Sequence, residues 1–345
     1  MSELRAACHG RDVERDGWPT VSVVMPIRNE ADHLGRAVES VLSQGYPLDF
    51  DVCLAVAPSD DGTETIAASI AEREPRVSVV ANPTGVTPAG LNAAIGATTG
   101  DVVVRVDGHA ALSDGYIRRA VDTMRRTGAV NVGGMQVPAP ETPFEQAVAA
   151  ATTSWLGTGG ATYRVGGRAG PVDTVYLGVF DRAAGDAVGW FDETLIRNQD
   201  YELNIRLRDA GGVVWFDPEL SVSYRPRGSF RDLAKQYYEY GRWKAEVVRR
   251  RPDTLRRRQT IPAVVTATLG LSIAGSIRRP SLLAIPAAYL AVVGAATTRL
   301  GPKAGPALVG MHIGWGCGFL SGLARAVAGP HRSDGSRPPA RTVDG

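Results

Sequence analysis

The chain has 345 residues, of which 44% are hydrophobic and 21% are charged. This length exceeds that of one ordinary domain, and the composition excludes a disordered, collagen-like or coiled-coil chain over most of the sequence. The net charge of +2 is the sum of two unlike parts. After Thr260 there are 8 basic but only 2 acidic residues, whereas the preceding body has a small acidic excess. The body therefore gives no sign of nucleic-acid binding.

Residues 1–18 are polar and lack the apolar core of a signal peptide, so we expect an N-terminal extension and a body that stays in the cytosol. Cys8, Cys53 and Cys317 are scattered and form no C-x-x-C pair. This pattern indicates neither a disulfide framework nor a structural zinc site, and it favours a reducing compartment.

Four short apolar runs alternate with segments of helical periodicity in the first 126 residues. The predicted strand and helix pairs are 21–26 with 32–44, 52–56 with 64–72, 77–80 with 88–97, and 102–106 with 114–126. Such alternation predicts an α/β fold with a mostly parallel, doubly wound sheet. Ligands of such sheets bind beyond the carboxyl ends of the strands, so the loops after these strands are the candidate site.

The signals are mixed between residues 129 and 226, where we expect a strand at 130–137 and a helix from about 200 to 210. Three weakly apolar stretches follow at 261–277, 281–298 and 304–323. Their lengths are near the requirement for a membrane span, and a buried helical hairpin is the alternative. The basic residues around them leave the number of spans open. Residues 329–345 are rich in Pro, Gly, Ser and Arg and are expected to be disordered.

The strongest candidate for chemistry is Arg105-Val-Asp107-Gly-His109 at the end of the fourth predicted strand. Residues two apart on an extended chain point the same way, so Asp107 and His109 could share one ion. A carboxylate with an imidazole suits Mn²⁺, with Mg²⁺ possible, and such a cation would neutralise a diphosphate. An ordinary polar strand end is the alternative.

A second candidate is Asp200, which follows Asn198 and Gln199 at the start of a predicted helix. A carboxylate held beside a sugar hydroxyl could remove its proton during attack. Acidic residues are also favoured in a first helical turn by the helix dipole, so spacing alone leaves both interpretations open.

Polar residues also follow the first two strands. Pro26, Arg28 and Glu30 come after the first strand and Asp61 after the second. Together with Arg105 and Asp107, they are our candidates for binding a nucleotide-sugar, although turn chemistry explains each loop equally well in isolation.

Taken in order, these motifs resemble those of the family 2 glycosyltransferases, in particular the membrane-associated, succinoglycan-biosynthesis (ExoA-like) branch. The resemblance covers about residues 20 to 245, and the ordered set is far more specific than any one motif. The matching segments are 21–30, 61–63, 90–92, 105–110, 189–193, 198–204 and 240–244.

The resemblance implies a GT-A fold that transfers a sugar from a nucleotide-diphosphate donor with inversion at the anomeric carbon. It places Asp107 on the family's metal motif with His109 at that motif's last acid, and Asp200 on its general base. Pro26, Glu30 and Asp61 fall on the nucleotide-binding loops. The sequence departs from the family where Ala57-Pro58 replaces an acid for the base of the nucleotide and where Gln199 replaces a Glu.

The aromatic and basic segment 236–244 is a candidate acceptor platform at the membrane surface. The predicted acceptor residues are Tyr240, Arg242 and Trp243 of this segment together with Gln199. An amphipathic helix packed on the body is the alternative. Gln236 lies six residues before Arg242, unlike the Q-x-x-R-W motif of processive synthases, so we expect one sugar to be added per encounter.

The resulting prediction is a metal-assisted glycosyltransferase of polysaccharide or cell-envelope biosynthesis, with a saccharide or lipid-linked acceptor. We place it at the cell membrane with its catalytic domain in the cytoplasm. A membrane-tethered, non-catalytic binding protein and a nucleotidyltransferase are the rivals. The expected parts are an extension at 1–18, a GT-A domain at 19–245, a basic juxtamembrane linker at 246–260, membrane-associated or transmembrane helices at 261–328, and a tail at 329–345.

Overall fold

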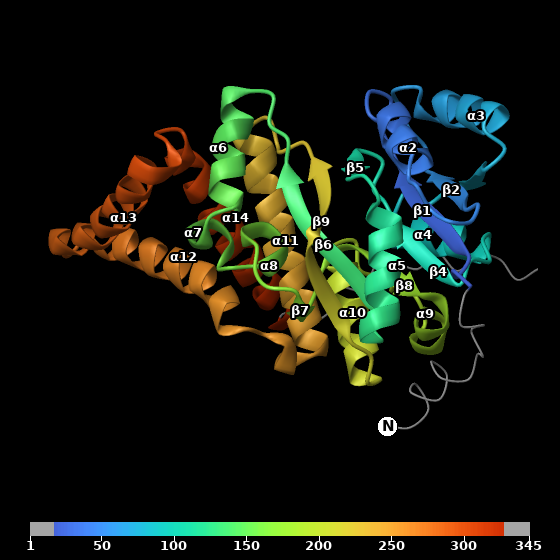
Figure 1. Cartoon of the computed structure of the whole chain (residues 1–345). Helices are drawn as coiled ribbons and strands as arrows, with labels where there is room; N and C mark the ends of the chain where they lie inside the picture. Colours follow the sequence, from blue (N-terminus) through green and yellow to red (C-terminus); the bar gives the residue numbers. More distant parts are fainter. Residues whose placement is uncertain (1–16, 328–345) are drawn as a thin grey trace, which may run out of the picture.

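A nine-stranded sheet runs through the centre of the molecule in the computed structural model, which describes residues 17–327 (Figure 1). The predicted extension at 1–18 and tail at 329–345 therefore lie almost wholly outside the described residues. One half of the sheet has the order β3-β2-β1-β4 with all strands parallel. These strands are β1 (Val21–Ile27), β2 (Asp51–Val56), β3 (Val77–Ala81) and β4 (Val102–Arg105).

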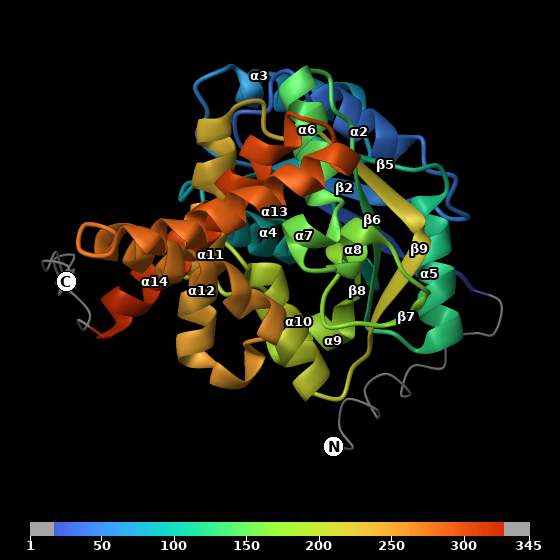
Figure 2. The ribbon, with the colours of Figure 1, turned by 90° about the vertical axis from the view of Figure 1, so that its left-hand side faces the viewer.

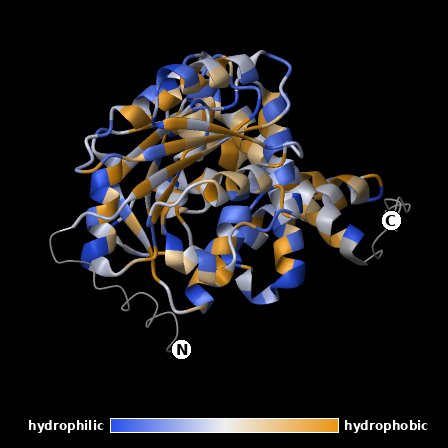
Figure 3. Ribbon diagram, turned by 90° about the vertical axis from the view of Figure 1, so that its right-hand side faces the viewer, coloured by the Kyte–Doolittle hydropathy of each residue, from blue (hydrophilic) through white to orange (hydrophobic). Residues whose placement is uncertain are grey.

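The predicted alternation of strands and helices is confirmed in this half. The four helices are α2 (Leu34–Leu42), α3 (Thr63–Arg73), α4 (Thr87–Gly96) and α5 (Tyr116–Thr127). Strands β1, β2 and β4 are buried along nearly their whole length because helices cover both faces, which is why they are runs of valine and other apolar residues. Figure 3 shows the strands of the sheet as predominantly hydrophobic.

The other half of the sheet is mixed, and only one of its strands was expected. Strand β8 pairs antiparallel with β4 and with β6, β9 runs parallel to β6, and β5 and β7 pair antiparallel with β9. The bounds are β5 (Ala110–Leu112), β6 (Asn131–Pro138), β7 (Gly170–Pro171), β8 (Tyr176–Asp181) and β9 (Val214–Tyr224). The sheet as a whole is thus mixed, with the parallel strands on one side.

The helices of the second half connect the sheet to the C-terminal region. They are α6 (Pro143–Thr152), α7 (Trp155–Thr158), α8 (Thr162–Val165), α9 (Arg182–Val188), α10 (Gln199–Asp209) and α11 (Phe230–Arg250). Helix α11 continues five residues beyond the predicted domain boundary at 245. Glu246 pairs with Arg249 and Arg250 within the helix, and Arg250 also pairs with Asp192 at 2.8 Å. The start of the predicted basic linker therefore belongs to α11 and is bound to the body of the fold.

The C-terminal region consists of η1 (Pro252–Thr254), α12 (Arg257–Gly275), η2 (Pro280–Leu283), α13 (Ala284–Leu300) and α14 (Ala304–Val327). Helices α12 and α13 extend away from the body, and Figure 2 shows them on the side that carries α11. Two segments of the described chain, Pro280–Leu300 and Ala304–Arg325, are long and apolar enough to cross a membrane. Only 6% of the first apolar window is buried, against 39% of the second.

Helix α14 is the more buried of the two because a row of glycines brings it close to α11. Gly310, Gly314, Gly318 and Gly322 are four residues apart and therefore share one face of the helix. Methyl groups at these positions would meet α11 from Phe230 to Ala245, and at Gly318 the methyl would overlap the carbonyl oxygen of Tyr238.

A buried lysine joins α11 to α10. Lys244 is 3% exposed, and its Nζ lies 3.9 Å from the ring centroid of Tyr201. The carbonyl oxygen of Thr254 accepts hydrogen bonds from both side chains, at 3.3 Å from Lys244 Nζ and 3.1 Å from Tyr201 Oη. Burial lowers the pKa of Lys244 to about 7.

We predict that Gly318→Leu destabilises the protein by about 1–3 kcal/mol, because a side chain there cannot fit without separating α11 from α14. Gly294→Leu on α13 is the matched control, since a Cβ at Gly294 meets no atom within 4 Å and the gain in helix propensity is the same. The measurement is thermal unfolding of both variants in detergent. Equal unfolding temperatures would show that the two helices are not closely packed.

We also predict that the free energy of unfolding rises between pH 7 and 9. In this pH range Lys244 is protonated in the unfolded chain, where its pKa is the ordinary 10.5. In the folded chain Lys244 becomes increasingly neutral as the pH rises, because its pKa is about 7. The unfolded state thus binds more protons, and raising the pH favours the folded state. Lys244→Met, which keeps the size of the side chain, should reduce this slope. Denaturant titrations of both proteins at pH 7 and 9 measure it, and an unchanged slope would exclude Lys244 as its source.

Candidate active site

The ends of β1, β2 and β4 bring the predicted loops together at one edge of the sheet. This follows from the parallel pairing of β1 with both neighbours, which aligns their carboxyl ends. Between the first two loops, the backbone N–H of Glu30 donates to Thr63 Oγ1 at 2.8 Å. Asp61 accepts from the Ala31 N–H at 3.0 Å and from the Thr63 hydroxyl at 2.6 Å. The hydrogen bonds from Thr63 and Ala31 lower the pKa of Asp61.

Glu30 meets His109 across the site. Its Oε1 lies 2.7 Å from Nδ1 of His109, and because an ionised carboxylate only accepts, the imidazole Nδ1–H donates. Burial lowers the pKa of His109, but the hydrogen bond to Glu30 and the charge of Asp107 outweigh burial and raise it. In the neutral ring this arrangement leaves Nε2 as the nitrogen with a free lone pair.

Arg105 is the buried cation of the site. Its guanidinium donates twice to Asp107 Oδ1, from Nη2 at 3.0 Å and from Nε at 3.2 Å, and lies 6.0 Å from the ring centroid of Phe191. The third nitrogen, Nη1, is buried without a hydrogen-bond partner in the described structure. Burial lowers the pKa of Arg105, but the charges of Asp107 and Asp200 outweigh burial and raise it. Arg105 therefore lies within the electric field of both predicted carboxylates.

Asp200 lies in the first turn of α10, and its Oδ1 accepts the N–H of Tyr201 at 2.8 Å. The residue before Gln199 is Asn198, which has a left-handed backbone with φ of 61°. Two contacts bind this turn to α11: Asn198 Nδ2 donates to the carbonyl oxygen of Tyr240 at 3.3 Å, and Arg197 pairs with Glu239 at 3.2 Å.

The predicted acceptor residues lie in different surroundings. Gln199 is buried, and the hydroxyl of Tyr240 accepts from Gln236 at 3.1 Å. Arg242 stacks on Trp243 with 5.5 Å between guanidinium and ring centroid. The ring of Trp243 packs on a buried cluster of side chains from α10, α11 and the loop before α10, made of Leu195, Tyr201, Ile205 and Val247. Of this set, Tyr240 has the direct hydrogen bond to the turn that carries Asp200.

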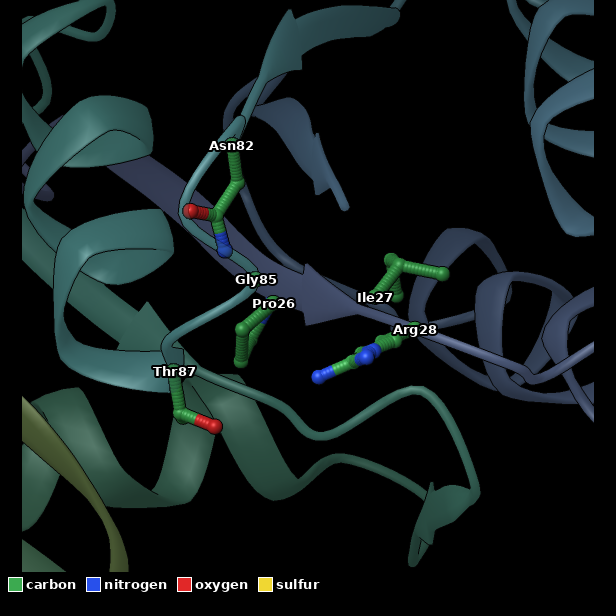
Figure 4. A pocket seen from close by; sticks show the side chains of 6 residues that line it. All are labelled: Pro26, Ile27, Arg28, Asn82, Gly85 and Thr87. Carbon is green, nitrogen blue, oxygen red and sulfur yellow. The ribbon is translucent and has the colours of Figure 1, made fainter. Parts of the chain in front are cut away.

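A small open pocket lies at the end of β1, between Pro26, Arg28 and the loop that follows β3 (Figure 4). Its other lining residues are Ile27, Asn82, Gly85 and Thr87. Gly85 has a φ of +66°, and a Cβ there would lie 3.3 Å from Nη1 of Arg28, so a larger residue would crowd the guanidinium. The sequence marks the loop after β3 only by its Asn-Pro-Thr-Gly turn, which is why Asn82, Gly85 and Thr87 were not predicted as site residues.

Asp107 and His109 form a two-residue donor set that suits a divalent cation. No group of three or more His, Cys, Asp or Glu side chains that could hold a metal occurs in residues 17–327. Two protein ligands are nevertheless enough where substrate phosphates supply others. The hydrogen bond from His109 Nδ1 to Glu30 also fits, because metal-binding histidines usually donate their second N–H to a carboxylate.

Comparisons with known proteins give a consistent result. The sequence profile of "Glycosyl transferase family 2" matches residues 22–192. The "Succinoglycan biosynthesis protein ExoA" of Rhizobium meliloti (strain 1021) is 29% identical over 306 residues, which cover 86% of this chain and 93% of that protein. A dolichyl N-acetyl-alpha-D-glucosaminyl phosphate glucuronosyltransferase of Methanococcus voltae is 22% identical, covering 67% of this chain and 74% of the relative.

Among solved structures, the mannosyltransferase PcManGT from Pyrobaculum calidifontis, in complex with GDP-Man and Mn²⁺, has the same fold. It superposes with a TM-score of 0.60 at 19% identity, covering 89% of this chain and 88% of that one. The predicted GT-A fold is thereby confirmed. With the family motifs lying at the ends of β1, β2 and β4 and at the start of α10, the chain belongs to glycosyl transferase family 2 and is a glycosyltransferase of the ExoA-like kind.

Proposed function

We propose that this enzyme transfers a sugar, with inversion, from a nucleotide-diphosphate donor to a hydroxyl group of a lipid-linked or cell-envelope saccharide. The observation that carries the proposal is the buried Arg105, which donates two hydrogen bonds to Asp107 and whose pKa is also raised by the charge of Asp200. Asp107 follows the end of β4 and Asp200 lies at the start of α10. A donor bound at Asp107 and an acceptor bound at Asp200 would therefore be held by two different elements.

The donor side is formed by Asp107, His109 and Arg105. Asp107 Oδ2 and His109 Nε2 would hold a divalent cation, Mn²⁺ or Mg²⁺, which supplies positive charge for the departing diphosphate. Arg105 fixes the other oxygen of Asp107, and Glu30 fixes the orientation of the imidazole. The presence of GDP-Man and Mn²⁺ in the PcManGT structure supports this assignment.

The acceptor side is formed by Asp200. Its carboxylate takes the proton from the acceptor hydroxyl as that oxygen attacks the anomeric carbon, and the bond from this carbon to the diphosphate oxygen breaks on the opposite face. One displacement inverts the anomeric configuration and requires no covalent intermediate with the protein. The contacts of Asn198 and Arg197 with α11 hold Asp200 in place for this step.

The nucleotide is held by the loops after β1, β2 and β3. Arg28 and Pro26 line the pocket with Asn82 and Thr87, which offer polar groups to a base or ribose. The carboxylates of Glu30 and Asp61 are already hydrogen-bonded to His109, Thr63 and Ala31. We therefore assign Glu30 and Asp61 to shaping the nucleotide site.

The membrane is the proposed location, with the catalytic domain on the cytoplasmic side. The apolar residues of α13 are almost wholly uncovered, and Arg278, Arg279 and Arg299 flank the helix. Helix α14 lies along α11, which carries charges from Arg231 to Arg250, so we propose that α12 and α13 enter the lipid while α14 stays with the catalytic domain. The similarity to a succinoglycan biosynthesis protein of R. meliloti and to a transferase of M. voltae named for a dolichyl-linked sugar phosphate supports a polysaccharide or phosphate-linked lipid acceptor.

We predict that Asp200→Asn lowers transfer by about 10²- to 10⁴-fold, because the amide cannot accept the hydroxyl proton. Binding of the donor should be unchanged, whereas Asp107→Ala should lose both metal-dependent donor binding and transfer. The exposed Asp114→Asn is the control. The assay measures nucleotide release from UDP-, GDP- and dTDP-sugars with Mn²⁺ and membrane lipid extract as the acceptor source. Full transfer by Asp200→Asn would exclude Asp200 as the base.

We predict that Glu30→Gln weakens Mn²⁺ binding by about 10- to 100-fold, because the amide no longer fixes the imidazole by a charge-assisted hydrogen bond. Free Mn²⁺ can be titrated by electron paramagnetic resonance in the presence of a nucleoside diphosphate. Asp60→Asn on the neighbouring loop is exposed and serves as the control. Identical Mn²⁺ affinities of Glu30→Gln and wild type would show that His109 does not bind the cation through this arrangement.

A further inference from the structure

A group of tyrosines from four separate elements gathers beside the site. We define the tyrosine cluster as Tyr163, Tyr176, Tyr224, Tyr237 and Tyr240, from α8, β8, β9 and α11. The rings of Tyr163 and Tyr176 stack with centroids 6.5 Å apart, and Tyr176 lies 6.5 Å from Tyr224. Tyr237 and Tyr240 meet edge to face at 5.6 Å. Tyr237 and Tyr240 belong to the predicted acceptor platform 236–244, whereas Tyr163, Tyr176 and Tyr224 were not predicted as site residues.

Arg164 lies among these rings without a carboxylate partner. Its Nη1 donates to the hydroxyl of Tyr224 at 3.4 Å, and its guanidinium lies 5.6 Å from the ring centroid of Tyr163. Arg164 is half-buried and has no ion pair within residues 17–327, whereas Arg105 pairs with Asp107 and Arg197 pairs with Glu239. A guanidinium withdrawn from water without a counter-charge is costly, and an anion would offset this cost.

The cluster borders the surroundings of both proposed catalytic carboxylates. Burial raises the pKa of Tyr176, and the charge of Asp107 raises it further, so Tyr176 lies within the field of the donor side. Tyr240 borders the turn of Asp200 through its carbonyl oxygen. A ligand bound by Arg164 would therefore lie beside tyrosine rings that border the surroundings of both proposed catalytic carboxylates.

The segment that leads into Tyr163 and Arg164 contacts the C-terminal helices. Arg258, at the start of α12, donates to the carbonyl oxygen of Gly160, just before α8, at 3.3 Å. Figure 2 shows α7 and α8 on the face that carries α11 and α12. A molecule whose hydrocarbon tail remains in the lipid around α12 and α13 could thus place its head group at Arg164.

We propose that Arg164 binds the phosphate or diphosphate that links the acceptor saccharide to its lipid, and that the tyrosine cluster forms the walls of this subsite. The inference rests on the proposed transferase function and adds the class of its acceptor. A guanidinium donates two parallel hydrogen bonds to phosphate oxygens, phenol hydroxyls donate further ones, and the aromatic faces accommodate the adjoining apolar or sugar surfaces. In the proposed function, the donor phosphates belong to Asp107 and His109 instead.

The test measures binding of geranyl diphosphate to the full chain in detergent by calorimetry, with geraniol as the phosphate-free probe. EDTA is included so that a metal-dependent diphosphate site contributes nothing. We expect Arg164→Gln to weaken binding of geranyl diphosphate by about 10- to 100-fold, and Arg164→Lys by less, since charge remains without the planar fork. Arg168→Gln, an exposed arginine four residues away, should bind like wild type.

Other sources of phosphate are separated by further arms of the same experiment. Nucleoside diphosphate binding with Mn²⁺ should be unchanged in Arg164→Gln, which also shows that the variant is folded, and should be lost in Asp107→Ala. Excess phosphatidylglycerol in the micelles should leave binding of geranyl diphosphate unchanged. Displacement by phosphatidylglycerol would overturn the proposal in favour of a bilayer headgroup site.

Three other results would also overturn it: equal binding by Arg164→Gln and wild type, equal binding of geraniol and geranyl diphosphate, or a parallel loss of nucleotide binding in Arg164→Gln. Failure of the proposed transferase function has a different signature. In that case nucleotide binding and sugar transfer are absent in wild type, while the difference between wild type and Arg164→Gln towards geranyl diphosphate persists.

Discussion

The buried guanidinium of Arg105 is the interaction on which the site depends. A cation at the end of a central strand is stable only if carboxylates face it, and here Asp107 and Asp200 supply that charge from elements far apart in sequence. Because Arg105 uses Oδ1 of Asp107, the direction of this carboxylate is fixed before any ligand arrives. The charge of Asp200 at the start of α10 also raises the pKa of Arg105, so the buried cation is electrostatically linked to both proposed catalytic carboxylates.

Much of the parallel half of the fold could be predicted because its signals are local. Runs such as Val21–Ile27 are buried on both faces and end in polar loops, and helical periodicity follows each of them. The grouping of Glu30, Asp61, Asp107 and His109 at one edge then follows from the topology alone. Their individual contacts did not follow, since the hydrogen bond between Glu30 and His109 joins residues 79 apart.

The mixed half of the sheet resisted prediction because long-range contacts override its local signals. Gly133 and Gly134 in β6 and Gly178 in β8 are typical of loops, yet a Cβ at Gly134 would overlap the backbone of Leu220 in the neighbouring strand. Strand β9 contains Asp217, which is tolerated at 3% exposure only because Arg119 and Thr123 bind its carboxylate. Arg164 was missed for the same reason, as the tyrosines around it come from α8, β9 and α11.

Helix α11 makes the site and the C-terminal helices parts of one structure. On one side, Tyr240 and Glu239 hold the turn of Asp200, and on the other the glycines of α14 lie against its backbone. Helix α14 cannot leave this position without exposing the face of α11 that its glycines cover. Helix α11 in turn cannot shift without moving the turn that carries Asp200. In the proposed function, a lipid-linked acceptor that enters along α12 would meet the proposed base Asp200 at a position that the packing of α11 against α14 fixes. A soluble acceptor could approach from any side, so it would not require the position of Asp200 to be fixed relative to the C-terminal helices.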